Sequence, residues 1–73
     1  MRDEMFFVNL GKRISLYREM KGLTIKDIVQ KTGIRKSYLQ KIEKGKAFGI
    51  TTSHLFKIAI ALGVSPIKII KDL

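Results

Sequence analysis

Six hydrogen-bonding side chains between residues 35 and 44 are the part of this sequence best suited to chemistry. Four of the six are cationic and none is acidic; they are Arg35, Lys36, Ser37, Gln40, Lys41 and Lys44. Lysine and arginine donate hydrogen bonds to guanine O6 and N7, glutamine can bond adenine N6 and N7, and serine can bond either base. On its own, a polar helix face of this kind is usually just exposed to water. The surrounding elements decide whether these side chains could read the edges of DNA bases.

The formal charge of the chain favours a polyanionic partner. Its 73 residues include 15 lysines and arginines against 6 aspartates and glutamates, which gives a net charge of +9. Such a field attracts nucleic acid or an anionic membrane surface, whereas the plain alternative is a soluble basic protein. The lysines are spread over several predicted helices instead of one face, and this disfavours the membrane surface.

Segments that would direct the chain into or across a membrane are not evident. No stretch approaches the run of about 18 apolar residues that a membrane span needs. The apolar run 5–8 near the start is too short for a signal peptide. We therefore expect a cytoplasmic protein.

Chemistry by metals, cofactors or nucleophiles is not expected. The sequence has no cysteine, which excludes disulfides and thiolate metal sites. His54 is the single histidine, and no ligand cluster surrounds it in the sequence, so a solvated or capping role is expected. No nucleophile–base pair and no glycine-rich phosphate loop is visible. We predict a protein that is not an enzyme and that needs no metal, cofactor or small-molecule ligand.

Apolar residues recur at helical spacing and predict an all-α protein, a bundle of five helices in one domain over residues 1–73. The predicted helices cover about residues 5–20, 24–31, 35–44, from Thr51 or Thr52 to 62, and from Pro66 onward. Their apolar stripes are Phe7, Leu10, Ile14 and Tyr17; Ile25, Ile28, Val29 and Thr32; Ile34, Tyr38, Leu39 and Ile42; Leu55, Ile58, Ala59 and Leu62; and Ile67, Ile70 and Leu73. The β-branched Ile67, Ile69 and Ile70 could suggest a strand, but the neighbouring lysines fit a helix face at least as well.

The second and third predicted helices form the most informative unit. Thr24 followed by Asp27 is a capping signal, because the threonine oxygen accepts from an amide and the carboxylate bonds back. Gly33 accepts the positive φ of a tight turn, and Ile34 restarts the apolar pattern. Two helices joined in this way are typical of a helix-turn-helix, whose second helix enters the major groove of DNA. The spacing predicts this motif over about residues 24–44.

Three stretches carry a resemblance to a known family: Gly22-Leu23-Thr24, residues 28–34 (IVQKTGI) and residues 37–45 (SYLQKIEKG). They are similar to the Cro and phage-repressor type (xenobiotic-response-element type) of helix-turn-helix protein, and the likeness covers about residues 9–72. The resemblance implies a five-helix, lambda-repressor-like fold. It also implies a sequence-specific transcriptional regulator, a homodimeric repressor or controller protein on a partly palindromic operator in double-stranded DNA.

Carried over position by position, the resemblance implies roles for single residues. Base-reading positions are matched by Lys36, Ser37 and Lys41, flanked by Arg35 and Gln40, and phosphate-binding positions by Thr24, Lys44 and Lys46. Lysines and helix N-termini commonly hold phosphates. Arg18 and Glu43 match an ion pair that ties the first helix to the end of the third, and we expect it to be partly buried.

Three departures from the family pattern bear on how the motif would dock. Ile25 stands where glutamine is common, and isoleucine can neither bond a phosphate nor brace the third helix. Val29 stands where alanine is usual, so its extra methyl groups are expected to push the two helices slightly apart. The loop 47–51 is one residue longer than usual and lacks the common proline. Phe48 in this loop is expected to be a core or dimer contact in preference to a DNA contact.

Two apolar clusters, residues 5–8 and the C-terminal isoleucines, exceed what one helix face must bury. Core packing is the simplest explanation of both, and a dimer seam is the functional one. The resemblance favours the C-terminal cluster as the seam: Val64, Pro66, Ile67, Ile70 and Leu73. An alternative function for the whole chain is an antitoxin-like or adaptor module that binds another protein through its apolar ends.

Overall fold

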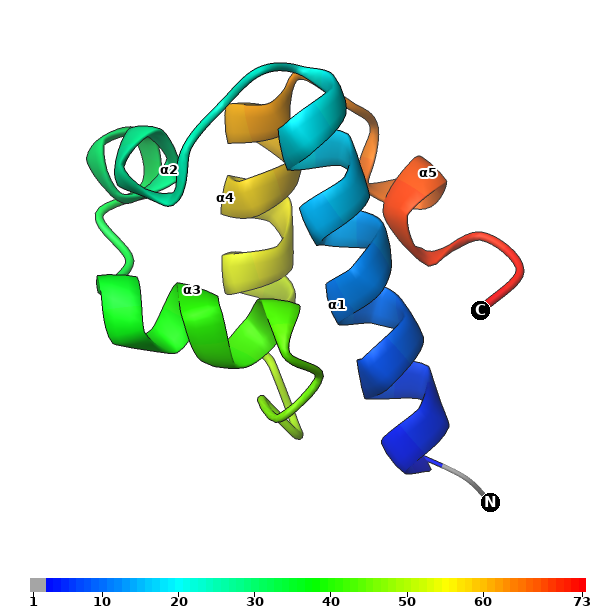
Figure 1. The fold of residues 1–73 in the computed structure, drawn as a ribbon. Coiled ribbons are helices and arrows are strands. Elements are labelled where there is room, and N and C mark those ends of the chain that lie inside the picture. The colour runs from blue at the N-terminus through cyan, green and yellow to red at the C-terminus, as the bar shows by residue number, and fades with distance from the viewer. Residues whose placement is uncertain (1–2) are drawn as a thin grey trace.

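The chain folds into five helices, as predicted, and the fold is all-α. The computed structural model describes residues 3–73. The helices are α1 (Asp3–Met20), α2 (Ile25–Thr32), α3 (Lys36–Glu43), α4 (Thr52–Leu62) and α5 (Pro66–Ile70) (Figure 1). No strand occurs among these described residues. None of the helices in this part of the chain is both long and apolar enough to cross a membrane.

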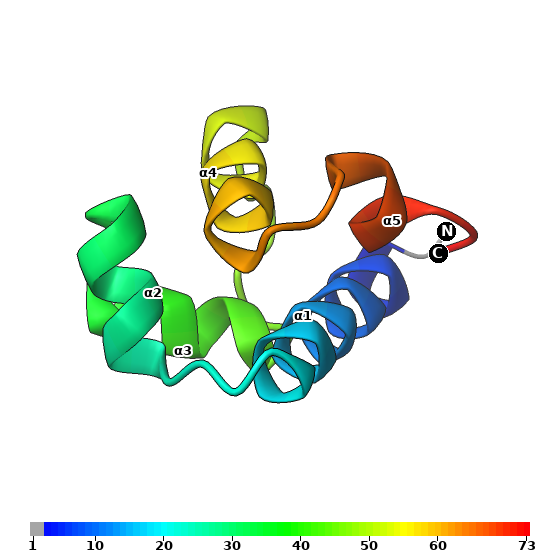
Figure 2. The same cartoon turned by 90° about the horizontal axis from the view of Figure 1, so that it is seen from above.

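The helices pack at steep angles around one core. α1 contacts α3 and α5, α4 contacts α2 and α5, and α2 contacts α3. Two views at right angles place α3 on one side of α1 and α5 on the other (Figures 1 and 2). α3 lies at the edge of the bundle, so one of its sides faces outward along its whole length.

The core confirms the predicted apolar stripes of the first four helices except at Ile25, which is partly buried but is not among the residues packed against the core cluster. The fully buried members are Leu10, Ile14, Ile28, Ile34, Leu39, Ile42, Ile58, Ala59 and Leu62 from these stripes, together with Ala47 and Ile69. Burying an aliphatic side chain of this size stabilises the fold by about 1.5–3 kcal/mol. Both sides of the helix-turn-helix unit contribute to this core, so its two helices are fixed to the rest of the bundle.

The stripe predicted for the last helix is wrong in one respect. Ile69 is the fully buried residue of α5, whereas Ile67 is 61% exposed. Ile70 and Leu73 pack against the edge of the core, as expected. The physical reason is length: α5 has only five residues, too few for a repeating apolar stripe to be established.

Local capping residues end and begin the helices where the sequence indicated. Gly33 adopts φ +76° after α2, and its backbone N–H donates to the carbonyl oxygen of Val29. The Thr51 hydroxyl caps α4 by accepting from the backbone N–H of His54. Ser65 caps α5, with Pro66 at its first position. These bonds satisfy backbone groups that a helix end would otherwise leave without a partner.

Gly11 allows α1 to approach α3 more closely than any side chain would permit. A Cβ atom at this position would lie 2.2 Å from the carbonyl oxygen of Ile42 and 2.9 Å from that of Glu43. Both oxygens belong to the backbone, which cannot move aside as a flexible side chain can. The absence of a Cβ therefore sets the spacing between α1 and the end of α3.

We predict that Gly11→Ala destabilises the protein by about 1–3 kcal/mol, the usual cost of forcing extra atoms into a packed contact. The sign of this change in the free energy of unfolding is informative, because alanine normally stabilises a helix interior by about 1 kcal/mol relative to glycine. Urea unfolding followed by circular dichroism measures the change. Gln30→Ala on the exposed side of α2 is the control, with an expected effect within about 0.5 kcal/mol. A Gly11→Ala variant as stable as wild type would contradict the contact.

Candidate nucleic-acid interface

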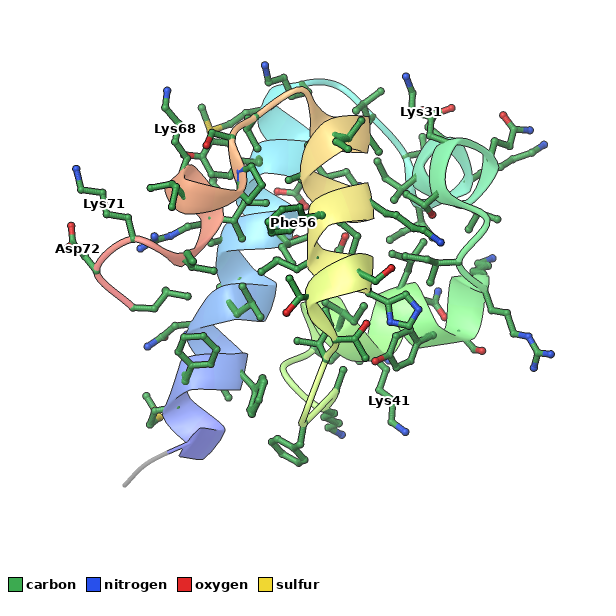
Figure 3. All side chains as sticks on the ribbon, turned by 180° about the vertical axis from the view of Figure 1, so that it is seen from behind. Lys31, Lys41, Phe56, Lys68, Lys71 and Asp72 are labelled. Atoms are coloured by element: carbon green, nitrogen blue, oxygen red, sulfur yellow. The ribbon has the colours of Figure 1, made fainter. Side chains whose placement is uncertain are left out.

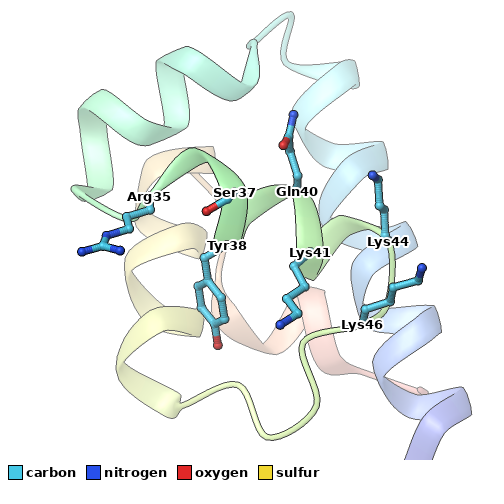
Figure 4. A pocket seen from close by; sticks show the side chains of 7 residues that line it. All are labelled: Arg35, Ser37, Tyr38, Gln40, Lys41, Lys44 and Lys46. Atoms are coloured by element: carbon cyan, nitrogen blue, oxygen red, sulfur yellow. The ribbon is translucent and has the colours of Figure 1, made fainter.

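The outward side of α3 and the segment after it form one shallow surface, which we call the α3 face. It is lined by Arg35, Ser37, Tyr38, Gln40, Lys41, Lys44 and Lys46 (Figure 4). Four of these residues are cationic and none is acidic. All of them except Tyr38 are exposed. The α3 face therefore presents donors and positive charge with no competing carboxylate.

The structure brings together most, but not all, of the predicted site residues. Lys36 is exposed at the first position of α3 but is not among the residues that line the α3 face. Thr24 lies apart from it, exposed at the N-cap of α2, where its hydroxyl accepts a hydrogen bond from the backbone N–H of Asp27 (3.1 Å). The α3 face thus extends from Arg35 to Lys46 along one helix and the loop that follows.

Tyr38 is a member of the α3 face that the sequence analysis assigned only to the core. Its ring packs against the core cluster, yet it also lines the α3 face (Figure 4). The ring lies 5.2 Å from that of His54, between centroids. A tyrosine commonly has one apolar and one polar end. Its place directly after Ser37 in the predicted reading helix was the signal that could have identified it.

His54 itself is explained by local contacts. Its Nδ1 lies 3.1 Å from the hydroxyl oxygen of Thr51, next to the N-terminal cap of α4. Among the side chains described, those of residues 5–73, no three histidine, aspartate or glutamate groups gather closely enough to hold a metal ion.

The predicted ion pair between α1 and the end of α3 is present. Arg18 Nε lies 2.7 Å from Glu43 Oε2 and Arg18 Nη2 lies 3.0 Å from Glu43 Oε1, so the pair is bidentate. The side chains are 15% and 13% exposed. The hydrogen bonds that Arg18 donates to the Glu43 carboxylate raise the pKa of Arg18, and this effect outweighs the opposing effect of burial. Arg18 also donates to the carbonyl oxygen of Leu23 (2.9 Å), which fixes the turn before α2.

The ion pair also affects the charge of the α3 face. Glu43 is the one acidic residue of α3, and its carboxylate is bound to Arg18 on the inner side of the helix. Leu39 and Ile42 are fully buried on that same side. As a result the outer side keeps its lysines without a neighbouring carboxylate to neutralise them.

The loop after α3 rests on the first turns of α1. Gly45 adopts φ +76°, and a Cβ there would lie 2.7 Å from the Cα of Val8. Ala47 is buried, and the ring of Phe48 meets the ring of Phe7 edge-on at 5.7 Å between centroids. Phe48 is nevertheless 60% exposed, so it is not a core residue, and a dimer contact stays a prediction. Lys46 is exposed on the α3 face.

Comparison with known proteins identifies the family. A model of the helix-turn-helix domain matches residues 11–72. This chain belongs to that helix-turn-helix family, of the Cro and phage-repressor type. It is 36% identical over 56 residues to the HTH-type transcriptional regulator SinR of Bacillus subtilis, a match that covers 77% of this chain and 50% of SinR. The helix-turn-helix chain thus spans about half the length of this curated relative.

Solved structures share the fold of this helix-turn-helix chain. The restriction-modification controller protein C.AhdI from Aeromonas hydrophila superposes with a TM-score of 0.82 at 27% identity, over 86% of this chain and 94% of that one. A complex of the SinR and SinI proteins superposes with a TM-score of 0.80 at 32% identity, over 86% of this chain and 61% of that one. The five-helix, lambda-repressor-like architecture is therefore established for this sequence.

The first helix of the helix-turn-helix begins with the predicted capping box. The backbone N–H of Thr24 donates to Asp27 Oδ2 (2.8 Å), and the backbone N–H of Asp27 donates back to the Thr24 hydroxyl. Hydrogen bonding of the Asp27 carboxylate, first to the Thr24 backbone N–H and then to the Thr24 side chain, lowers the pKa of Asp27. Ile25 and Val29, which depart from the family pattern, are both partly buried on α2. Val29 packs against the core cluster.

We predict that Glu43→Ala destabilises the protein by roughly 2–3 kcal/mol, because it leaves the Arg18 guanidinium partly buried without its carboxylate. Arg18→Ala should cost about as much, and the double variant should cost much less than the sum. Unfolding of the four proteins in urea yields the coupling energy, which we expect to exceed about 1.5 kcal/mol. A coupling below about 0.5 kcal/mol would put the pair among ordinary surface ion pairs.

Proposed function

We propose that this chain is a sequence-specific DNA-binding regulator of transcription that inserts α3 into the major groove. The α3 face carries this proposal, since it joins cationic and amide side chains on an exposed helix with no acidic member. Its geometry is held from behind by buried Leu39 and Ile42 and by the Arg18–Glu43 pair. Rigid support matters, because base recognition depends on the placement of individual donors.

Different residues would serve affinity and sequence choice. Lys36, Ser37 and Lys41 would read base edges, with Arg35 and Gln40 beside them, as in the position-by-position resemblance. Lys44 and Lys46 at the end of the α3 face, and Thr24 at the start of α2, would hold phosphates. The net charge of +9 supports this division, because phosphate contacts dominate affinity for any DNA sequence.

We also propose that the regulator acts as a homodimer on a partly palindromic operator. A two-fold axis would set the two α3 helices roughly 34 Å apart, one turn of DNA. Four of the five proposed seam residues are partly buried: Val64, Pro66, Ile70 and Leu73. The fifth, Ile67, is exposed. Phe56 and Ile60, spaced four residues apart on α4, add exposed apolar area (49% and 76%). The sequence analysis did not mark these two, because they lie outside the buried stripe of α4.

A second candidate function is that of a protein-binding adaptor, in the manner of an antitoxin. The exposed apolar residues on several helices favour it, because exposed apolar patches often mark sites of contact with other proteins. The SinR–SinI complex supports it to the extent that a relative of this fold was solved together with another protein. A protein with this function would form a stable complex with its partner and bind DNA weakly when alone.

Selection of binding sites from random duplex DNA, at near-physiological salt, tests the proposed function directly. We expect enrichment of an inverted repeat whose half-sites lie about one helical turn apart. Enrichment of a single half-site would support the DNA-reading role of α3 and contradict the dimer. Only salt-sensitive binding without enrichment would contradict sequence-specific regulation and favour the adaptor.

We predict that Lys41→Ala relaxes the base preference at one position of the selected site and weakens binding there by about 1–3 kcal/mol. Lys46→Ala should instead weaken binding to all duplexes alike and lower the salt dependence of affinity by about one ion. Fluorescence anisotropy with matched and mismatched duplexes separates the two effects. Lys57→Ala on α4 removes the same charge outside the α3 face and serves as the control. Equal losses on every sequence for Lys41→Ala would contradict its base-reading role.

A further inference from the structure

A groove lies between α1 and α5, apart from the α3 face. Its volume is about 550 Å³, and its lining includes Arg13, Leu16, Tyr17, Met20, Lys68 and Lys71. A smaller hollow of about 280 Å³ shares Arg13 and Leu16 and continues along α1 to Lys12. We call the two together the α1–α5 groove. Lys68 and Lys71 extend from α5 at one side of the molecule, whereas Lys41 of the α3 face lies at the other (Figure 3).

The floor of the α1–α5 groove is apolar and accessible. Leu16 is 55% exposed and Met20 is 69% exposed, and both line the groove. They stand one turn apart on α1, outside the stripe that Leu10 and Ile14 bury in the core. Two large apolar side chains at this spacing match the apolar stripe of a helix laid beside them, which is a common way of binding peptides.

The rim of the α1–α5 groove is basic. Lys12 and Arg13 contribute positive charge from α1, while Lys68 and Lys71 contribute it from α5. Asp72 is the one acidic residue among those that line it. An apolar floor between cationic walls is complementary to a helix with an apolar stripe and acidic flanks.

Arg13 holds the two walls of the groove together. Its Nη1 donates to the carbonyl oxygens of Lys68 and Ile69, each at 3.4 Å, and to that of Lys71. These carbonyls lie at the C-terminal end of α5, where a cation is favoured by the helix dipole. The groove is therefore already formed before any partner arrives, which lowers the entropic cost of binding.

We propose that the α1–α5 groove binds an acidic amphipathic helix of a partner protein. A second copy of this chain would bring its own net charge of +9 to this basic rim, so charge disfavours it as the occupant of the groove. Of the proposed dimer-seam residues only Leu73 also lines the groove, so the homodimer would form on other side chains. A flat anionic bilayer fits a concave site between two helices less well than a cylindrical helix does. The proposal goes beyond DNA binding: it gives the molecule a separate surface for a protein partner.

DNA and this partner could be bound at the same time. α3 and α5 lie on opposite sides of α1 (Figures 1 and 2). The two surfaces have no lining residue in common. A partner held in the groove would consequently be brought to the DNA site without displacing the DNA.

A synthetic helix with leucines at positions i, i+3, i+4 and i+7 and glutamates on both flanks is the probe. Titration into isotopically labelled full-length protein, at near-physiological salt, should shift the amide resonances of residues 12–20 and 67–72. Leu16→Glu and Lys68→Glu should each weaken binding at least about tenfold, roughly 1.4 kcal/mol. Lys57→Glu, the same charge reversal as Lys68→Glu at an exposed position of α4 that lines neither the groove nor the α3 face, should leave binding unchanged. Thermal unfolding of each variant verifies that it is folded.

Four outcomes would overturn the proposal. One is equal binding by wild type and Leu16→Glu. Another is equal binding of a control helix that carries glutamine in place of glutamate, which would show that the positive charge of the rim does not contribute to binding. The third is displacement of the peptide by duplex DNA with resonance shifts on the α3 face. The fourth is binding of anionic lipid vesicles where the peptide does not bind. The titration itself contains no DNA, so its result stands whether or not the site selection succeeds.

Discussion

The close approach of α1 to the end of α3 is the constraint on which the rest of the structure depends. Gly11 lets the backbone of α1 lie against the last carbonyl oxygens of α3. Arg18, which also lies on α1, binds the side chain of Glu43 at the end of α3. α3 has only eight residues, and a helix of that length is not stable alone in water. Its orientation is therefore imposed by α1, and the positions of all side chains on the α3 face follow from that orientation.

The electrostatics of the molecule depend on the same contact. Because the carboxylate of Glu43 is bound to Arg18, the outer side of α3 retains its cations without an acidic neighbour. The loop that carries Lys46 is held by Val8 and Phe7 of α1, so the basic surface continues beyond the end of the helix. One helix thus fixes both the part of the α3 face suited to bases and the part suited to phosphates.

α1 also separates this face from the groove on its other side. Its inner stripe is buried in the core, while Leu16 and Met20 remain exposed beside the basic residues of α5. Arg13 joins α5 to α1 much as Arg18 joins α3 to it, in each case through donors of a guanidinium. The two arginines, five residues apart on one helix, connect it to both neighbours, and the bundle gains two surfaces of different chemistry.

The sequence by itself determined the helices, their caps and most of the residues of the α3 face, because these depend on neighbours within a few residues. Thr24, Gly33 and the apolar stripes of the first four helices specify their conformations locally, and the structure agrees. The family resemblance added the Arg18–Glu43 pair. Only the tertiary structure decided that Ile69 and not Ile67 is buried, that Phe48 stays exposed and that Tyr38 joins the α3 face. The need for glycine at residue 11 and the α1–α5 groove were equally invisible. All of these depend on how helices far apart in sequence are rotated and spaced against one another, which local patterns do not encode.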